Sequence, residues 1–110
     1  MVKKESQPSP EINPRQARHL KGLGHHLQPL AMIGRDGITE TVTASVQDIL
    51  RAHELVKVKV QQNCPLERHE AGRLLAARTR SSLVQVLGRI FLLFKANPDL
   101  PPERRIHLPT

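Results

Sequence analysis

Aromatic side chains are almost missing from this chain, whose 110 residues include two Phe and neither Tyr nor Trp. Proteins that read unstacked bases usually hold those bases on aromatic rings. A surface that recognises its ligand mainly by aromatic stacking is therefore not expected. Any nucleic acid bound by this chain would be held mainly through its phosphates and sugars.

Cysteine and long apolar runs are also scarce. The one cysteine, Cys64, cannot form a disulfide within the chain, so the fold does not depend on oxidation. No stretch approaches the roughly 20 apolar residues needed to cross a bilayer. The first residues are polar and lead into prolines rather than into an apolar segment. We therefore expect a cytoplasmic location.

Positive charge is what the chain has in excess. It carries 17 Lys and Arg against 10 Asp and Glu, a formal net charge of +7, and its sequence pI is about 10.5. A surplus of this size on a short chain favours polyanionic partners. Two other interpretations stay open, a basic protein whose charge only keeps it soluble and one that binds anionic membranes. The membrane interpretation is the weaker, because no segment combines a large apolar face with anchoring Trp or Tyr.

The length and the positions of the prolines predict one domain with two extensions. A chain of 110 residues, 38% hydrophobic and 25% charged, suits a single globular domain with a modest core. We expect a flexible N-terminal arm (residues 1–12), the domain (residues 13–97) and a proline-rich basic tail (residues 98–110). Prolines at positions 98, 101, 102 and 109 predict that this tail is unstructured. We expect a monomer.

Three segments have the apolar spacing of helices. The first begins with Asn13 as N-cap and Pro14 at the first helical position. The second follows Thr39 as N-cap, and the third covers about residues 66–80. The apolar positions that define these helices are Leu20, Leu23, Gly24 and Leu27, then Val42, Val46, Ile49 and Leu50, then Ala71, Leu74 and Leu75. Gly24 weakens its helix, so we expect it to permit close packing.

Four segments between these helices are expected to be strands. Residues 30–33 form a short apolar run, read as a buried strand, and residues 55–60 alternate valines with Lys57 and Lys59. Residues 83–87 and 90–95 are apolar and are joined by Gly88-Arg89, which predicts a hairpin. The order α-β-α-β-α-β-β predicts an α/β domain with a four-stranded mixed sheet and packed helices.

The segment Gly34-Arg35-Asp36-Gly37 is the sharpest candidate for a binding site. Two glycines let the backbone approach a ligand closely, and the helix start beyond them offers N–H groups to a phosphate. Arg35 adds donors suited to phosphate oxygens. Asp36 would repel a phosphate, so we expect it to shape the turn. A purely structural turn between a strand and a helix explains the two glycines equally well.

Basic residues elsewhere could extend such a site. Lys57 and Lys59 project from one strand face, and Arg15 and Arg18 lie three apart on one side of a helix. Lys21, Arg89 and Lys95 are further candidates. A strand that carries lysines is more often only a solvated face, and the overall charge is what favours a binding surface here.

No pattern in the sequence indicates a metal or a catalytic centre. The histidines and Cys64 show neither C-x-x-C nor H-x-x-x-H spacing, so no zinc site and no cofactor are expected. The acidic residues are scattered, and we expect a protein that is not an enzyme. An enzyme that binds a phosphorylated small molecule at the glycine loop stays an alternative, which the lack of an acid, base or nucleophile argues against.

Four motifs together resemble one known family, the CRM domain (chloroplast RNA splicing and ribosome maturation), and above all its stand-alone bacterial YhbY-like form. The resemblance covers about residues 16–97, and four motifs in register are far more specific than a glycine pair alone. The motifs are Leu20-Lys21-Gly22-Leu23-Gly24-His25-His26-Leu27-Gln28-Pro29, Ile33-Gly34-Arg35-Asp36-Gly37, His53-Glu54-Leu55-Val56-Lys57-Val58-Lys59-Val60 and Leu83-Val84-Gln85-Val86-Leu87-Gly88-Arg89.

The resemblance implies a fold and a function. It implies a fold similar to the C-terminal domain of translation initiation factor 3, and RNA binding through a glycine loop of the kind by which KH domains clamp the backbone. Family members of the bacterial form are associated with precursors of the large ribosomal subunit. The expected RNA-binding residues are Gly34, Arg35, Asp36, Gly37, Lys21, Lys57, Lys59 and Arg89.

Two points stay open at this stage. The family loop commonly reads Gly-Lys-Asn-Gly, and Asp36 stands where the family has the asparagine. A carboxylate in place of the neutral amide puts a direct RNA contact by this side chain in doubt. The rival interpretation is a DNA-binding or nucleoid-associated protein, because charge alone does not distinguish the two nucleic acids.

Overall fold

Three helices and four strands follow one another in the order that the sequence predicts. The computed structural model describes residues 11–110, so most of the predicted N-terminal arm lies outside the described residues. The elements are α1 (Pro14–Gly24), β1 (Ala31–Ile33), α2 (Glu40–His53), β2 (Leu55–Val60), α3 (Arg68–Thr79), β3 (Ser82–Leu87), β4 (Ile90–Phe94) and the short 3-10 helix η2 (Pro102–Arg104).

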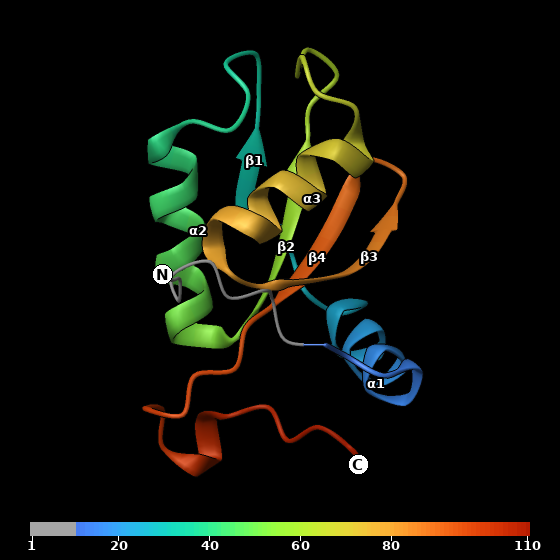
Figure 1. Ribbon diagram of the computed structural model, residues 1–110, viewed down its shortest axis with the longest axis vertical. Helices are drawn as coiled ribbons and strands as arrows, with labels where there is room; N and C mark the ends of the chain where they lie inside the picture. The colour runs from blue at the N-terminus through green and yellow to red at the C-terminus, as the bar shows by residue number, and fades with distance from the viewer. Residues whose placement is uncertain (1–10) are drawn as a thin grey trace, which may run out of the picture.

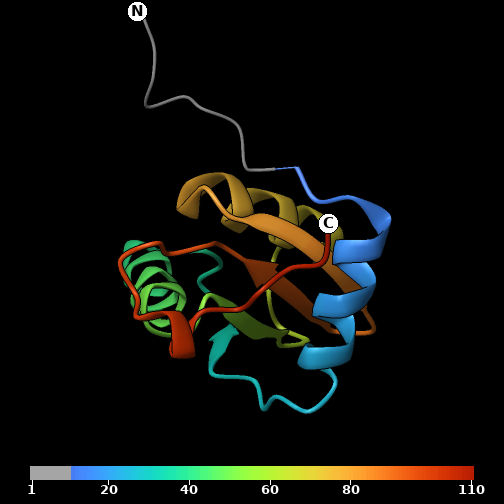
Figure 2. The same cartoon turned by 90° about the horizontal axis from the view of Figure 1, so that it is seen from below.

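The strands form one mixed sheet in the order β1-β2-β4-β3. Strand β1 runs parallel to β2, which places Ala31 opposite Val58, and both β2 and β3 pair antiparallel with β4. Helices α2 and α3 cover one face of this sheet and α1 lies on the other (Figure 1, Figure 2). The predicted single α/β domain is confirmed, and its likeness to initiation factor 3 stays a prediction.

Alternation along β2 separates the two faces of the sheet. Val56, Val58 and Val60 are buried in the larger core, beneath α2 and α3. Leu55 points to the other face and packs with Leu20 of α1 in a smaller core. Because successive side chains of a strand point to opposite faces, Lys57 and Lys59 share the side of α1.

The predicted helix starts are confirmed at two positions. The Asn13 side chain accepts from the Gln16 amide at 2.7 Å, with Pro14 following, and the Thr39 hydroxyl accepts from the Val42 amide at 3.1 Å. Both caps satisfy an N–H that has no partner within its helix. Helix α3 begins two residues later than expected, because the Glu67 carboxylate caps it.

Gly24 lets α1 pack closely on the sheet, as expected. A Cβ atom built on Gly24 would lie 2.7 Å from a methyl group of Leu92. Helix α1 ends at this glycine, and Leu23 and Leu27, which were expected to complete its apolar face, remain 39% and 38% exposed.

The expectation of a buried strand at residues 30–33 is only partly correct. Ile33 is fully buried, whereas Leu30 and Met32 are 58% and 55% exposed. Strand β1 is an edge strand, and the contacts of α1 are with β2, β3 and β4. The side of β1 that carries Met32 therefore has no helix over it.

The segment after β4 is held on the domain, so the prediction of an unstructured tail is wrong. Glu54, fully buried at the end of α2, accepts hydrogen bonds from the backbone amides of Asn97 (2.6 Å) and Ile106 (2.5 Å). Its carboxylate also lies 3.7 Å from Nε of Arg105. A buried carboxylate with these partners fixes two points of the tail.

Apolar contacts attach the rest of the tail. Ile106 and Leu108 pack against the smaller core, and the carbonyl of Pro109 accepts a hydrogen bond of 3.1 Å from the Gln16 side chain. Proline restricts the local backbone but does not prevent these side chains from packing. Within residues 11–110, no helix is long and apolar enough to cross a membrane.

Replacing Glu54 by Gln tests the role of this carboxylate. Glu54→Gln leaves Arg105 without its charge partner and turns an amide NH2 toward a backbone donor, so the free energy of unfolding should fall by about 3 kcal/mol. Urea unfolding followed by circular dichroism measures this. Glu103→Gln, at an exposed glutamate of η2, is the control and should change little. A wild-type midpoint for Glu54→Gln would contradict the assignment.

Candidate RNA-binding surface

The glycine loop (residues 34–37) is a tight turn at the end of β1. The Gly37 amide donates to the Gly34 carbonyl at 3.0 Å, which puts Arg35 and Asp36 at the two central positions. Gly37 has φ +72°, a conformation that favours glycine. The side chains of Arg35 and Asp36 are exposed at the tip.

One expectation about this loop is confirmed and one needs correction. Thr39 is the N-cap of α2, as predicted, so Ile38 and Thr39 separate the loop from the helix, and the Thr39 hydroxyl already accepts the hydrogen bond of the Val42 amide. The Asp36 side chain makes no hydrogen bond with any described residue, so the turn is shaped by Gly37 rather than by Asp36. Among residues 11–110, nothing accepts a hydrogen bond from the amides of Arg35 and Asp36, which are the donors that the turn offers to a ligand.

The connection between β2 and α3 (residues 61–67) lies against the glycine loop. The Gln61 amide donates to the Ile33 carbonyl at 2.9 Å. A Cβ atom on Gly34 would lie 2.8 Å from Oε1 of Gln61 and 3.9 Å from Oδ1 of Asn63. Glycine at position 34 therefore lets the two loops touch.

The turn of the β3–β4 hairpin, Gly88-Arg89, adjoins the same connection. The Val60 amide donates to the Arg89 carbonyl at 2.7 Å, and Lys59, Gln61, Asn63 and Arg89 line one hollow. The glycine loop, the connection 61–67 and this turn together are called the loop edge. Figure 1 shows the first two at the top of the sheet and the hairpin turn to their right.

The predicted site residues fall into two neighbouring groups. Lys59 and Arg89 lie with the glycine loop on the loop edge. Lys21 and Lys57 line a second hollow, on the sheet face that carries α1. Lys57 and Lys59 join the two groups, because alternate residues of a strand lie on one face about 7 Å apart.

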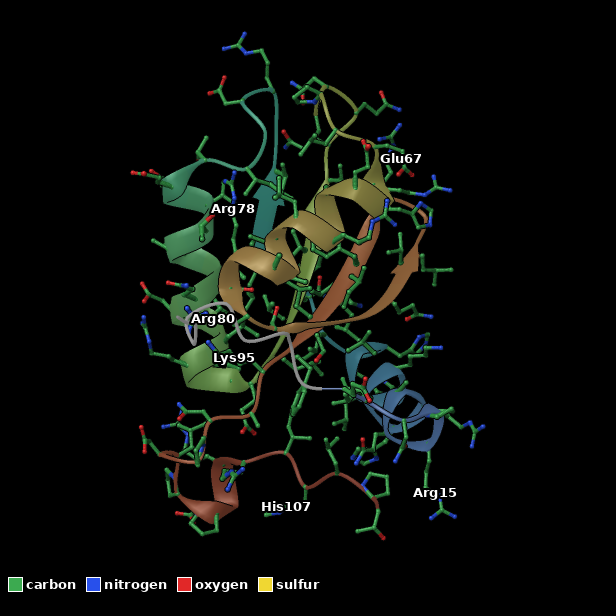
Figure 3. All side chains as sticks on the ribbon, viewed as in Figure 1. Arg15, Glu67, Arg78, Arg80, Lys95 and His107 are labelled. Carbon is green, nitrogen blue, oxygen red and sulfur yellow. The ribbon has the colours of Figure 1, made fainter. Side chains whose placement is uncertain are left out.

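Two other basic residues considered with them lie elsewhere. The ammonium of Lys95 donates to the Thr79 carbonyl at 3.0 Å, at the C-terminal end of α3. Figure 3 places Arg15 at the end of the molecule opposite the glycine loop. Neither belongs to the loop edge.

The cations of the loop edge are not neutralised by neighbouring acids. Of the ion pairs formed within residues 11–110, none involves Arg35, Lys59 or Arg89. The loop edge itself carries two carboxylates, those of Asp36 and Glu67, and hydrogen bonds from the side chain and then the backbone of His69 lower the pKa of Glu67 to about 2. Arg68 and Arg89 line the same shallow hollow as this carboxylate.

Several residues of this surface were not predicted from the sequence. Gln61 and Asn63 contact the glycine loop, and Arg78 donates to the Ile38 carbonyl at 3.0 Å across 40 positions of the chain (Figure 3). Among the residues that were missed, only Arg68 had a signal in the sequence, which is its positive charge near the start of α3. The contact of Arg78 depends on the packing of α3 beside α2, which no local pattern reveals.

The described residues form no cluster suited to a metal ion. Among residues 11–110, no group of three or more His, Cys, Asp or Glu side chains is placed to hold an ion. The Cys64 sulfur accepts a hydrogen bond of 3.4 Å from the Leu66 amide, a contact within the connection 61–67.

The two loop glycines should respond differently to alanine. Gly37→Ala forces a side chain into the left-handed region and should lower the free energy of unfolding by about 1 kcal/mol. Gly34→Ala should cost less, because its Cβ meets only the mobile end of the Gln61 side chain. Thermal unfolding of both variants measures the difference. A larger loss for Gly34→Ala would show that the contact with Gln61 is rigid.

Two proteins that are similar in sequence to this chain are named for RNA binding. The chain is 33% identical over 95 residues to YqeI of Bacillus subtilis, which is named a probable RNA-binding protein. The aligned residues cover 86% of this chain and 96% of that protein. It is 35% identical over 98 residues to an RNA-binding protein of Haemophilus influenzae, covering 89% and 95% of the two chains.

A solved structure and a family model complete the comparison. The solution structure of SAV1595 from Staphylococcus aureus superposes with a TM-score of 0.74 at 33% identity, covering 90% of this chain and 100% of that one. Residues 12–95 match the CRS1 / YhbY (CRM) domain. Since this match spans the glycine loop, the whole sheet and all three helices, the chain belongs to the CRS1/YhbY (CRM) domain family.

Proposed function

We propose that this protein binds RNA along the loop edge. The observation that carries the proposal is that the backbone amides of the glycine turn lie on one edge of the sheet with Arg35, Lys59 and Arg89, cations that form no ion pair with any acid of residues 11–110. Exposed amides and basic side chains are the groups that hold phosphate oxygens. The RNA-binding names of two relatives supply the class of polyanion.

The finer proposal is that the RNA is ribosomal RNA in a precursor of the large subunit. The protein would assist assembly in the cytoplasm, as a monomer and without catalysing a reaction. Its contribution would be electrostatic, with the glycine loop holding phosphates and with Lys57, Lys59, Lys21 and Arg89 extending the contact. Support comes from the family and from a surface that presents phosphate-binding groups rather than an acid, base or nucleophile in a cleft.

Reversing the loop charge should abolish binding without unfolding the protein. In Arg35→Glu/Asp36→Glu both positions are exposed, so the fold should survive while a carboxylate replaces the phosphate-binding guanidinium. We expect no detectable binding to ribosomal RNA at physiological salt. For Arg35→Ala, the slope of log affinity against log salt should fall by about 1. Fluorescence anisotropy measures both.

Arg15→Glu is the matched control for net charge. It also replaces one exposed arginine by a glutamate, but at the opposite end of the molecule, and it should lower the affinity only modestly. Normal binding by the loop variant would contradict the loop model. Equal competition by duplex DNA and structured RNA at fixed salt would favour a DNA-binding protein instead.

Crosslinking in cells, followed by sequencing of the bound RNA, tests the ribosomal part. We expect reads concentrated in ribosomal RNA of the large subunit, with the protein sedimenting beside immature particles in a sucrose gradient. The loop variant should lose both signals. Reads spread over messenger RNA would contradict the assembly role while leaving RNA binding intact.

A further inference from the structure

The hollow lined by Lys21 and Lys57 lies on the sheet face of α1, between the end of that helix and the β3–β4 hairpin. Its lining residues come from four elements that are distant in the sequence, and they include Lys21, His25, Lys57, Gln85, Leu87 and Ile90. This hollow is called the helix hollow. It is separate from the glycine loop, none of whose residues line it.

The floor of the helix hollow is aliphatic and open to solvent. Leu87 is 70% exposed although it ends a strand, and Ile90 beside it in the hairpin is only half-buried. Gly22 leaves further room, because a Cβ atom built there would meet nothing within 4 Å. An exposed apolar surface with polar groups around it is typical of a binding site.

The groups around this floor suit a nucleotide. Lys21 and Lys57 form no ion pair with any described acid, so both are available to phosphates. Gln85 has both donors and an acceptor, the combination needed at the edge of a base. The exposed ring of His25 meets His26 edge to face at 5.3 Å and can take a base on its open side.

We propose that the helix hollow binds an unpaired base of the RNA whose backbone follows the loop edge. This inference rests on the proposed RNA binding and adds a preference for single-stranded or looped RNA. Lys57 and Lys59, on one face of β2, carry the backbone from the loop edge to the hollow. The base packs on Leu87 and Ile90, because both Phe side chains are buried and offer no exposed ring.

Variants that leave the charge unchanged separate this site from the electrostatic one. Leu87→Ala removes the exposed part of the floor, and Gly22→Leu fills the hollow from α1. Leu30→Ala is the control, since Leu30 is similarly exposed but lies outside the hollow. The probes are an RNA hairpin with a short unpaired extension and the same hairpin with blunt ends, both closed by a non-nucleotide linker so that neither contains unpaired loop bases.

The expected result is a loss that depends on the unpaired extension. Leu87→Ala and Gly22→Leu should each weaken binding of the extended hairpin about tenfold, because the base loses the apolar surface on which it packs. The salt dependence and the affinity for the blunt hairpin should stay as in the wild type. Leu30→Ala should bind both RNAs normally. Because Leu87 is exposed, its variant should keep the wild-type unfolding midpoint, whatever becomes of Gly22→Leu.

Other results overturn the proposal in distinguishable ways. Wild-type affinity of Leu87→Ala for the extended hairpin, or an equal loss for both hairpins, would show that no unpaired base occupies the hollow. The loop edge would then still bind RNA. If the wild-type protein bound neither hairpin, the proposed function itself would fail.

Discussion

Incomplete cover of one sheet face by α1 determines where the central strand β2 carries its two lysines. Helix α1 buries Leu20 against Leu55 at one end of that face, whereas α2 and α3 cover the other face along the whole length of β2. A lysine is tolerated in a central strand only where no helix lies over it, because burial of an unpaired charge is costly. The positions of Lys57 and Lys59 follow from that constraint.

Much of the fold was predictable because it depends on neighbours in the sequence. Asn13 and Thr39 cap helices through residues three positions away, and the alternation of β2 is visible in six residues. The tail was mispredicted because its attachment depends on Glu54, more than 40 positions earlier. A glutamate is ordinarily a surface residue, so nothing in its local sequence reveals that it is buried.

The candidate RNA-binding surface was predictable in its parts and not in its arrangement. The glycine loop and the outward direction of Lys59 follow from local patterns. Their proximity to Arg89 requires the β2–β4 pairing, and Gln61 contacts Gly34 only because β1 and β2 are parallel neighbours. The scarcity of aromatic residues argues against ring stacking as the main mode of recognition, and this stays a prediction. It did not reveal that aliphatic side chains such as Leu87 lie exposed beside basic ones.

The contact between Gln16 and Pro109 brings the two ends of the described domain together. The glycine loop lies at the opposite end of the molecule from this junction (Figure 1). A domain whose ends meet can be inserted into a host chain, or repeated along one, without distorting its interior. In such a chain each copy of the domain would present its own loop edge. Each loop edge would lie on the side of its domain away from the linkers that join the copies.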